Sequence, residues 1–507
     1  MSKISHPLKN RSVGLTSLLL TLTLVGVARG DDLPAVSVRA LENSEIVNKG
    51  PDGNLSVMNK DGTPINGLKL SQYDQLIDSP NLAVGPDGVI HVAFIERQVA
   101  SPFTFFVYHR QSADGGKSWS EPKNLSDDMP NIPVAHCRLL VDAQNRVYII
   151  WRTGLSDGFP TGDGSDVNLV YRVLNNGKWS KIIPVHPPGS ATAQNVGALF
   201  SFAVTDPAGN AAVVWNACPN TYHTNLLAGG WMGLPGIGNG LVFQATLDGK
   251  TAPTPKEIYM AKVTTDPNNA EYGKSCDTFS ALDGYVDAAG AAHFIAIARA
   301  MRSQESGSQI DLFEDGKQTP VLKLPSAEMT TWVTPPKLLL DAQGRRHIIA
   351  FYNAGEHPNF RDYVIGSDDD PTAILAAKGP KGTCLGFQAY QGPGGHMAVV
   401  MQTSETGYND SGDSWISMSD GGTWSQPVCV TANAARASWA SKNKGALLTV
   451  GTGDHYGPGA GAVAFDKDGH LLLALVNVKT GSFGLSAGGV MYASGSVASP
   501  MLFFYKF

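Results

Sequence analysis

The chain has 507 residues and a formal net charge of −6. An acidic balance without any basic run argues against nucleic acid or an anionic membrane surface as a partner. A chain of this length ordinarily forms two or three domains, unless a repeat architecture absorbs it in one.

Residues 1–30 have the pattern of a signal peptide. A basic start with three cations precedes an apolar core at 13–27, and Ala28 and Gly30 place small residues at the two positions that a signal peptidase inspects. The alternative is a membrane anchor, for which about fifteen apolar residues are short. We therefore expect a secreted or periplasmic protein that starts near Asp31, has a net charge of −10 after losing four cations, and contains no membrane span.

The segment 31–75 lacks the repeat that fills the rest of the chain. It contains two turn signals, Pro51-Asp52-Gly53 and Lys60-Asp61-Gly62. We expect strands of this N-terminal lead-in to complete the last unit of the repeat and so to close a ring.

A short phrase returns seven times over residues 76–507: an apolar run, a turn built on Asp or Gly, and a second apolar run. Each copy reads as a β-hairpin. The copies are 79–97, 136–152, 201–216, 282–299, 336–352, 385–402 and 461–477, with turn anchors at Asp87, Asp142, Asp206, Asp287, Asp341, Gln391 and Asp466. Anchors 50 to 81 residues apart leave room for a four-stranded antiparallel blade plus loops. The sequence predicts an all-β fold, a β-propeller with seven blades, or with six if two phrases share one blade.

A second hairpin follows several of these phrases, most clearly at 106–125. Its turn has the pattern S-x-D-x-G-x-x-W, formed by Ser112, Asp114, Gly116 and Trp119. The Ser and Asp can bond turn amides, the Gly permits a left-handed residue, and the Trp packs back on the blade. Degenerate copies occur at 174–180 and 419–425.

This pattern resembles the Asp-box, or BNR, repeat of the sialidase-like β-propeller superfamily. The resemblance covers residues 76–507 and implies a propeller with a bias toward carbohydrate as the partner. It does not by itself imply catalysis, because Asp-boxes also occur in propellers that only bind.

The five cysteines are Cys137, Cys218, Cys276, Cys384 and Cys429. They share no C-x-x-C spacing, so we expect no zinc site and no other metal or cofactor. The alternatives are one or two disulfides between blades or buried, unpaired thiols in strands. A monomer is expected.

Candidate functional residues were placed by strand order. Turns A–B and C–D lie on one face of a propeller, so residues just before strand A and just after strand B share the opposite face, at the mouth of the channel. Three second strands end on arginine, at Arg97, Arg152 and Arg299. Their planar forks suit the carboxylate of an acidic sugar, whereas the alternative is that their stems cover apolar edges. The other expected substrate-binding residues at this mouth are Trp332, His455 and Tyr456.

The catalytic candidates are His136, Tyr222, His223 and Glu356. In a polysaccharide lyase, His and Tyr would move protons while Arg299 neutralised a uronate. A hydrolase would need two carboxylates across the mouth, from Glu96, Asp277, Glu356 and Glu405. Sialidases carry an R-I-P motif where this chain has Asn131-Ile132-Pro133, which argues against true sialidase chemistry.

Two functions from different classes therefore remain open. The first is a carbohydrate-active enzyme on an acidic sugar, either a glycoside hydrolase or a polysaccharide lyase. The second is a non-catalytic propeller that binds a glycan or a protein, in which aromatic residues such as Trp332 and Tyr456 would be stacking platforms. Convergence of a His or carboxylate pair at the mouth would distinguish them.

Overall fold

A computed structural model describes the chain over the following residues: 47–49, 55–57, 68–69, 77–98, 104–128, 134–153, 169–185, 201–217, 241–260, 278–299, 307–325, 336–354, 357–367, 372–373, 383–392, 395–404, 413–419, 423–429, 462–466, 470–478, 483–485, 491–493 and 500–506. All of them belong to one compact unit that begins at Pro34. Within these ranges the regular structure is β-strand, and none of it is a helix that could cross a membrane.

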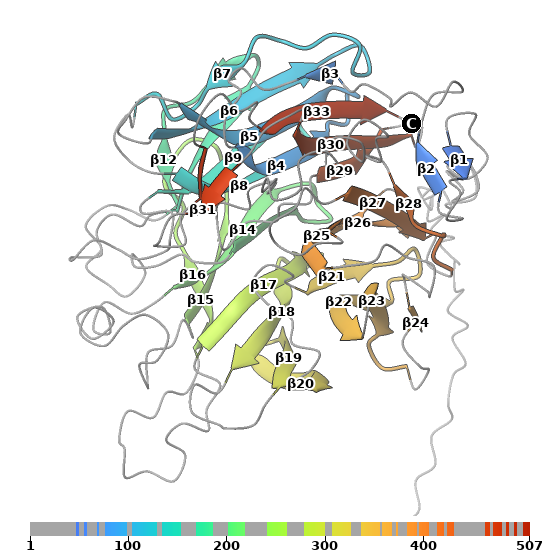
Figure 1. Ribbon diagram of the computed structural model, residues 1–507. Helices are drawn as coiled ribbons and strands as arrows, with labels where there is room; N and C mark the ends of the chain where they lie inside the picture. The colour runs from blue at the N-terminus through green and yellow to red at the C-terminus, as the bar shows by residue number, and fades with distance from the viewer. Residues whose placement is uncertain are drawn as a thin grey trace, which may run out of the picture. The chain divides into compact units, whose positions relative to one another are not determined.

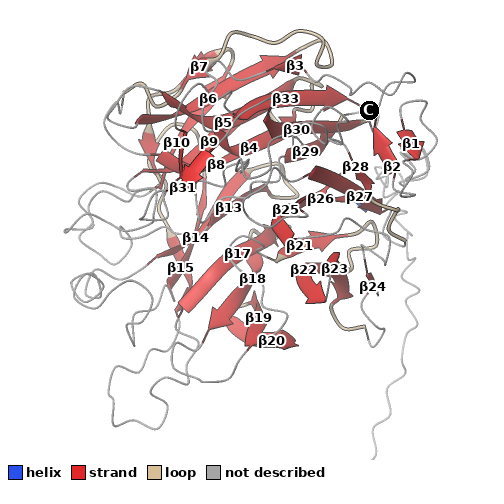
Figure 2. Ribbon diagram, in the orientation of Figure 1, coloured by secondary structure: helices blue, strands red, loops and turns tan. Residues whose placement is uncertain are grey.

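Seven sheets, each with an antiparallel A-B-C-D core, follow one another along the described chain (Figure 1, Figure 2). In each sheet the strands lie in the order A-B-C-D from the inside outward, and each predicted hairpin phrase supplies strands A and B of its own sheet. The all-β propeller prediction is confirmed, and no two phrases share a blade.

The strand bounds define the blades, numbered 1 to 7 in chain order. Strands A are β4 (Ile77–Val84), β8 (Val134–Val141), β13 (Ser201–Thr205), β17 (Thr278–Val286), β21 (Lys337–Leu340), β25 (Thr383–Gln391) and β29 (Ala462–Phe465). Strands B are β5 (Ile90–Gln98), β9 (Val147–Thr153), β14 (Ala211–Ala217), β18 (Ala292–Arg299), β22 (Arg346–Ala354), β26 (Met397–Ser404) and β30 (Leu471–Val478). Strands C are β6 (Thr104–Ser112), β10 (Leu169–Asn175), β15 (Leu241–Thr246), β19 (Gly307–Glu314), β23 (His357–Val364), β27 (Asp413–Ser419) and β33 (Pro500–Lys506).

The outer strands D are shorter in most blades. They are β7 (Lys123–Asn124), β11 (Lys178–Trp179) with β12 (Ile183–Pro184), β16 (Lys256–Met260), β20 (Lys317–Pro325), β24 (Thr372–Ala373), β28 (Val428–Cys429) and β3 (Leu68–Lys69). A separate hairpin pairs β31 (Phe483–Leu485) with β32 (Met491–Ala493).

The inner strands close a ring. Each strand A contacts the strand A of the next blade, and β29 of blade 7 contacts β4 of blade 1. Strand β3, from the N-terminal lead-in, is the outer strand of blade 7 and pairs antiparallel with the C-terminal β33. Two further strands of the lead-in, β1 (Val47–Lys49) and β2 (Leu55–Val57), extend blade 6 through a parallel pairing of β2 with β28. Both ends of the described chain therefore hold the ring shut.

Strand B is apolar on both sides because a neighbouring blade covers each face of its sheet. Every residue of β9 is buried, and the fully buried side chains Trp151 and Trp215 come from β9 and β14. This is why the second half of each repeat phrase reads as a continuous apolar run instead of the alternating pattern of a half-exposed strand.

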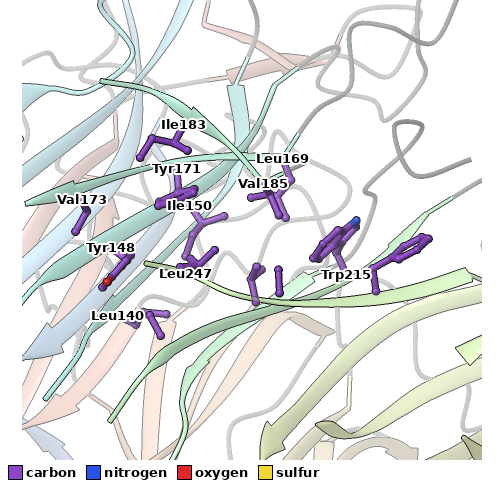
Figure 3. Close-up of a cluster of buried hydrophobic side chains, with 14 residues drawn as sticks. Leu140, Tyr148, Ile150, Leu169, Tyr171, Val173, Ile183, Val185, Trp215 and Leu247 are labelled. Atoms are coloured by element: carbon purple, nitrogen blue, oxygen red, sulfur yellow. The ribbon is translucent and has the colours of Figure 1, made fainter. Parts of the chain in front are cut away.

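The hydrophobic core is divided among the interfaces between blades. One cluster joins blades 2 and 3, with Tyr148 and Tyr171 from one side and Trp215 and Leu247 from the other (Figure 3). Another joins the last blade to the first, where Ala462 and Leu472 pack with residues of β4 and β5. Ring closure thus buries apolar surface in the same way as every other blade contact.

The A–B turns share one hydrogen-bonding scheme. In blade 2, the amide of Asp142 donates to the carbonyl of Arg146, and Asp142 Oδ1 accepts from the amides of Gln144 at 2.9 Å and Arg146 at 2.8 Å. The same scheme is built on Asp287 and Asp341. An aspartate that accepts its own turn's amides is the reason this residue type recurs there.

Two of the seven predicted anchors were misplaced. In each turn one amide donates to the carbonyl of the residue four positions later. In blade 1 this amide is that of Gly85 and in blade 6 it is that of Gly392, whereas the predicted anchors were Asp87 and Gln391. In blade 1 the Asp87 carboxylate still accepts the amide of Val89. A side chain at Gly392 would approach Phe465 of blade 7 within 2.4 Å, so packing against the next blade requires glycine there.

Neighbouring A–B turns also interlock. The amide of Ala143 in blade 2 donates to the carbonyl of Gly209 in blade 3 at 3.1 Å. A Cβ at Gly209 would lie 2.2 Å from Ala143 Cβ, whereas a Cβ at Gly290, the same turn position in blade 4, would meet nothing within 4 Å. Both glycines have positive φ, +82° and +79°.

Replacing these two glycines separates backbone strain from the contact between blades. Gly290→Ala should lower the free energy of unfolding by about 1–2 kcal/mol because of its left-handed backbone. Gly209→Ala should lower it by about 1–3 kcal/mol more, because the added methyl group collides with Ala143. Urea unfolding of both variants measures the difference, and equal losses would show that the turns do not interlock.

A buried polar network ties blade 5 to blade 6. His347 is 2% exposed and contacts Asp362 at 2.9 Å through Nδ1 and Asp341 at 3.3 Å through Nε2. Asp362 also accepts the indole N–H of Trp424, from blade 6, at 3.0 Å. Burial lowers the pKa of His347, but the bonds to Asp362 and Asp341 outweigh it, and the net pKa lies above the usual value.

The network predicts a pH-dependent stability. A histidine whose pKa is raised on folding stabilises the folded protein. This contribution is fully present below the pKa of the unfolded state, about 6.5, and is lost as the pH rises through the pKa of the folded state. His347→Gln should therefore lower the thermal midpoint most at acidic pH, and the difference from the parent protein should narrow as the pH rises. His470→Gln, at a 49% exposed side chain, is the control. A difference that stayed constant with pH would mean that folding does not shift the pKa of His347.

Candidate functional site

The candidate site is the central cavity together with the propeller end at which strands A begin and strands B end. Of the predicted residues, Arg97, His136 and Arg299 lie on described strands, although only their backbone is described, and Arg152 is described with its side chain. The other six lie outside the described residues: Tyr222, His223, Trp332, Glu356, His455 and Tyr456.

The three predicted arginines occupy matching backbone positions. Arg152 lies opposite Ala135 at the start of β8, Arg299 lies opposite Thr278 at the start of β17, and Arg97 stands near the end of β5. They come from blades 2, 4 and 1 and share the end predicted to carry the mouth. Arg152 is 1% exposed, so its guanidinium is buried behind the end of the strand.

Other polar side chains are buried at the same end. Glu96 lies two residues before the end of β5, Thr153 ends β9, and Asn216 lies one residue before the end of β14, each at most 2% exposed. Ser201 starts β13 and is 6% exposed. Buried polar side chains need hydrogen-bond partners within the protein, and they occur at the turn end as well, for example Asp142 and His347.

Four inner strands are irregular near this end. The register shifts between Asp78 and Asn81 in β4, and equivalent shifts occur in β8, β17 and β25. His136 lies within the shift of β8, between Ala135 and Arg138. Bulges of this kind occur often beside functional sites, where they redirect side chains.

A cavity of about 890 Å³ lies between the inner strands of the blades. Its charged and polar lining includes Asn81, Arg138, Asp283, Lys337 and Gln388. Each of these stands four residues before the turn anchor of its blade, so all five lie at one level of the ring.

At this level, side chains bond the edges of neighbouring inner strands. Asn81 Nδ2 donates to the carbonyl of Cys137 at 2.8 Å, and Arg138 Nε donates to the carbonyl of Ser201 at 3.2 Å. Strand A is the edge of its sheet, and its channel-side backbone groups have no strand partner. The polar side chains at this level therefore form hydrogen bonds with backbone groups on the inner edge of the next blade, and they also make the cavity lining polar.

Asp283 and Lys337 form the best-defined charged pair of the cavity. Lys337 Nζ lies 3.4 Å from Asp283 Oδ1, and the amide of Leu338 donates to Asp283 Oδ2 at 2.8 Å. Burial raises the pKa of Asp283, although Lys337, the Leu338 amide and the nearby Arg138 all act to lower it. Arg138 is therefore close enough to Asp283 to act on it electrostatically.

Tyr390, on β25, brings a phenol into the same cavity. Burial raises the pKa of this phenol, while Arg138 acts to lower it. Its proton stays in place at neutral pH. Polar groups from blades 2, 4, 5 and 6 thus converge on one region: Arg138, Asp283, Lys337 and Tyr390.

Sequence reasoning did not select these four residues as a site. All four lie within the hairpin phrases, whose apolar runs the sequence analysis took as strands of the core. The usable signal was position: each lies two or four residues before a turn anchor, where an inner strand lines the channel.

The Asp-box turn of blade 1 lies between strands β6 and β7. Ser112 Oγ donates to Asp114 Oδ1 at 2.8 Å and accepts the amide of Gly116 at 2.8 Å, while Trp119 Nε1 donates to the carbonyl of Gly116 at 3.2 Å. Hydrogen bonds from Ser118 and then Ser112 hold the pKa of Asp114 well below its usual value. Trp119 packs against the cluster that joins blades 7 and 1.

Among the described residues, no three His, Cys, Asp or Glu side chains are grouped as metal ligands would be. Cys137 is a buried thiol of β8 outside any disulfide.

No protein-family model and no curated protein matches the chain. Among solved structures, it is similar to a Hadza microbial sialidase at 11% identity, over 74% of this chain and 72% of that one, with a TM-score of 0.41. It is similar to Trypanosoma rangeli sialidase in complex with sialic acid at 13% identity, over 75% and 57%, with a TM-score of 0.42. It is similar to Penicillium chrysogenum α-L-arabinanase complexed with arabinobiose at 10% identity, over 71% and 98%, with a TM-score of 0.42. Likenesses this distant assign neither a family nor an activity.

The Asp-box geometry predicts unequal effects for two serines that both bond Asp114. Ser112 is 1% exposed, so Ser112→Ala should cost about 1–3 kcal/mol of unfolding free energy through the loss of two buried hydrogen bonds. Ser118 is exposed, and Ser118→Ala should change stability by roughly 0.5 kcal/mol or less. Chemical denaturation compares them, and equal effects would refute a structural role for the buried serine.

Proposed function

We propose that this protein is a carbohydrate-active propeller enzyme that acts on an acidic glycan outside the cytoplasm, after removal of residues 1–30. The reaction is either hydrolysis of a glycosidic bond or β-elimination at a uronate. The proposal combines the resemblance of the Asp-box turn with the polar end of the propeller.

The observation that carries it is the placement of three arginines. Arg97, Arg152 and Arg299 come from three blades, and each is the last or the last but one residue of its strand B. A guanidinium donates two parallel hydrogen bonds to a carboxylate, which a neutral sugar does not offer. Three of them around one mouth favour a uronic or sialic unit over a neutral one.

The buried groups nearby support a reaction as well as binding. His136 lies in the irregular part of β8, within the same blade as Arg152, and Glu96 is fully buried at the end of β5. A histidine and a carboxylate at one mouth are groups that serve as general base or acid. In a lyase, His136, Tyr222 and His223 would transfer the protons; in a hydrolase, Glu356 would act with a second carboxylate.

A panel of acidic and neutral polysaccharides and sialosides tests the proposal. Ultraviolet absorbance of an unsaturated uronate indicates a lyase, and new reducing ends without absorbance indicate a hydrolase. We expect turnover of an acidic member and none of its neutral counterpart. Products from neutral glycans alone would refute the acidic substrate. The absence of any product across the panel would refute the enzyme and leave the alternative of a propeller that only binds glycans. Retention on a glycan array then tests that alternative.

Arginine variants test the carboxylate role. Arg97→Gln and Arg299→Gln should each lower kcat/KM for the acidic substrate by roughly 10- to 100-fold, because each removes a charged hydrogen bond worth about 1.5–3 kcal/mol. Arg345→Gln is the matched control, since Arg345 is half exposed and bonds Asp341 at the opposite turns. Equal losses for all three variants would contradict the assignment.

A further inference from the structure

The central cavity holds a charged group of its own, away from the arginines that end strands B. Arg138, Asp283 and Lys337 lie at one level of the inner ring and come from blades 2, 4 and 5. Lys337 contacts Asp283 directly, and Arg138 acts electrostatically on both Asp283 and Tyr390. All four residues line the same cavity.

The charges of this group do not cancel. Arg138 and Lys337 contribute two positive charges, and Asp283 contributes one negative charge. The other charged residue named in the described lining, Asp287, lies at the A–B turn, where it accepts amides of its own turn and bonds His293. The middle of the cavity thus carries one excess positive charge in partly buried surroundings, where charge interactions are less screened than at the surface.

We infer that the central cavity binds one small carboxylate monoanion between Arg138 and Lys337. The excess charge matches a monoanion. The guanidinium of Arg138 has five N–H donors, of which the bonds to the carbonyls of Ser201 and Cys137 use two. Lysine offers a further N–H, and the Tyr390 phenol retains its proton as a donor. Asp283, already bonded to Lys337 and to the Leu338 amide, disfavours a dianion and accepts a hydrogen bond from a hydroxyl group beside the carboxylate.

The ligand class that meets these demands is a hydroxylated monocarboxylic acid, such as a single sugar acid. The cavity volume of about 890 Å³ is within the range of small-molecule sites. Only the choice of a sugar acid as the ligand rests on the proposed function. Binding itself requires no turnover, so the two ideas fail separately.

The experiment is isothermal titration of the purified full chain with sodium glucuronate, with glucose as the neutral control at matched ionic strength. Glucuronate should bind and glucose should not. Lys337→Met keeps the apolar stem and removes the charge, and it should weaken glucuronate binding roughly tenfold or more. Asp283→Asn keeps an acceptor for the Leu338 amide and removes the opposing charge, so it should tighten binding.

Two further variants keep the test decisive. Lys337→Met alone leaves Asp283 unpaired and can lower the thermal midpoint. In that case the double variant Lys337→Met/Asp283→Asn removes both charges of the pair together. It should bind glucuronate more weakly than Asp283→Asn does. Arg345→Gln, at the opposite turns, should bind as the parent protein does. Equal affinity for glucuronate and glucose, no glucuronate binding, or insensitivity to both cavity substitutions would overturn the inference.

The outcomes separate this site from the proposed enzyme. Glucuronate binding that follows the predicted order of variants, in a protein that turns over no glycan, supports the cavity site and refutes the enzyme. Turnover of an acidic glycan without glucuronate binding supports the enzyme and refutes the cavity site.

Discussion

The structure depends on the burial of each blade between two others. Strands B are apolar on both faces, and Trp151 and Trp215 are fully buried where blades meet. A sheet with two apolar faces cannot be stable alone, so every blade requires both neighbours, and the first and last blades require each other. Removing one such indole would cost about 3–5 kcal/mol, which is comparable to the stability of many whole domains. Closure of the ring is therefore a condition for folding.

Closure also explains the polar features inside the ring. Placing strand A at the axis leaves its inner, channel-facing edge without a strand partner, and backbone groups there need hydrogen bonds. Asn81, Arg138 and Asp283 supply them to the next blade. The same side chains make the cavity polar and charged, so a requirement of the fold creates a place where a charged ligand can be bound.

The opposite turns meet a different requirement. Neighbouring A–B turns touch closely enough that Gly209 and Gly392 have no room for a side chain. Farther out, the buried His347 network joins blade 5 to Trp424 of blade 6. These contacts hold the turn end of the ring together, while the other end gathers buried polar side chains such as Glu96, Arg152 and Asn216.

The sequence by itself determined the propeller, because its evidence is local and periodic. Apolar runs on either side of an Asp or Gly turn predict hairpins, and seven copies predict the ring that the topology confirms. The anchors at Asp142, Asp287 and Asp341 follow from the same local chemistry, in which a carboxylate accepts its own turn's amides.

Only the tertiary structure decided which distant residues meet. Gly85 and Gly392 replace the predicted anchors, and contact with Phe465 of the next blade explains the second. Any two of Arg138, Asp283, Lys337 and Tyr390 are between 53 and 252 residues apart in the sequence, and no local pattern joins them. They converge because ring closure brings four inner strands to one axis, and that geometry exists only once every blade is in place.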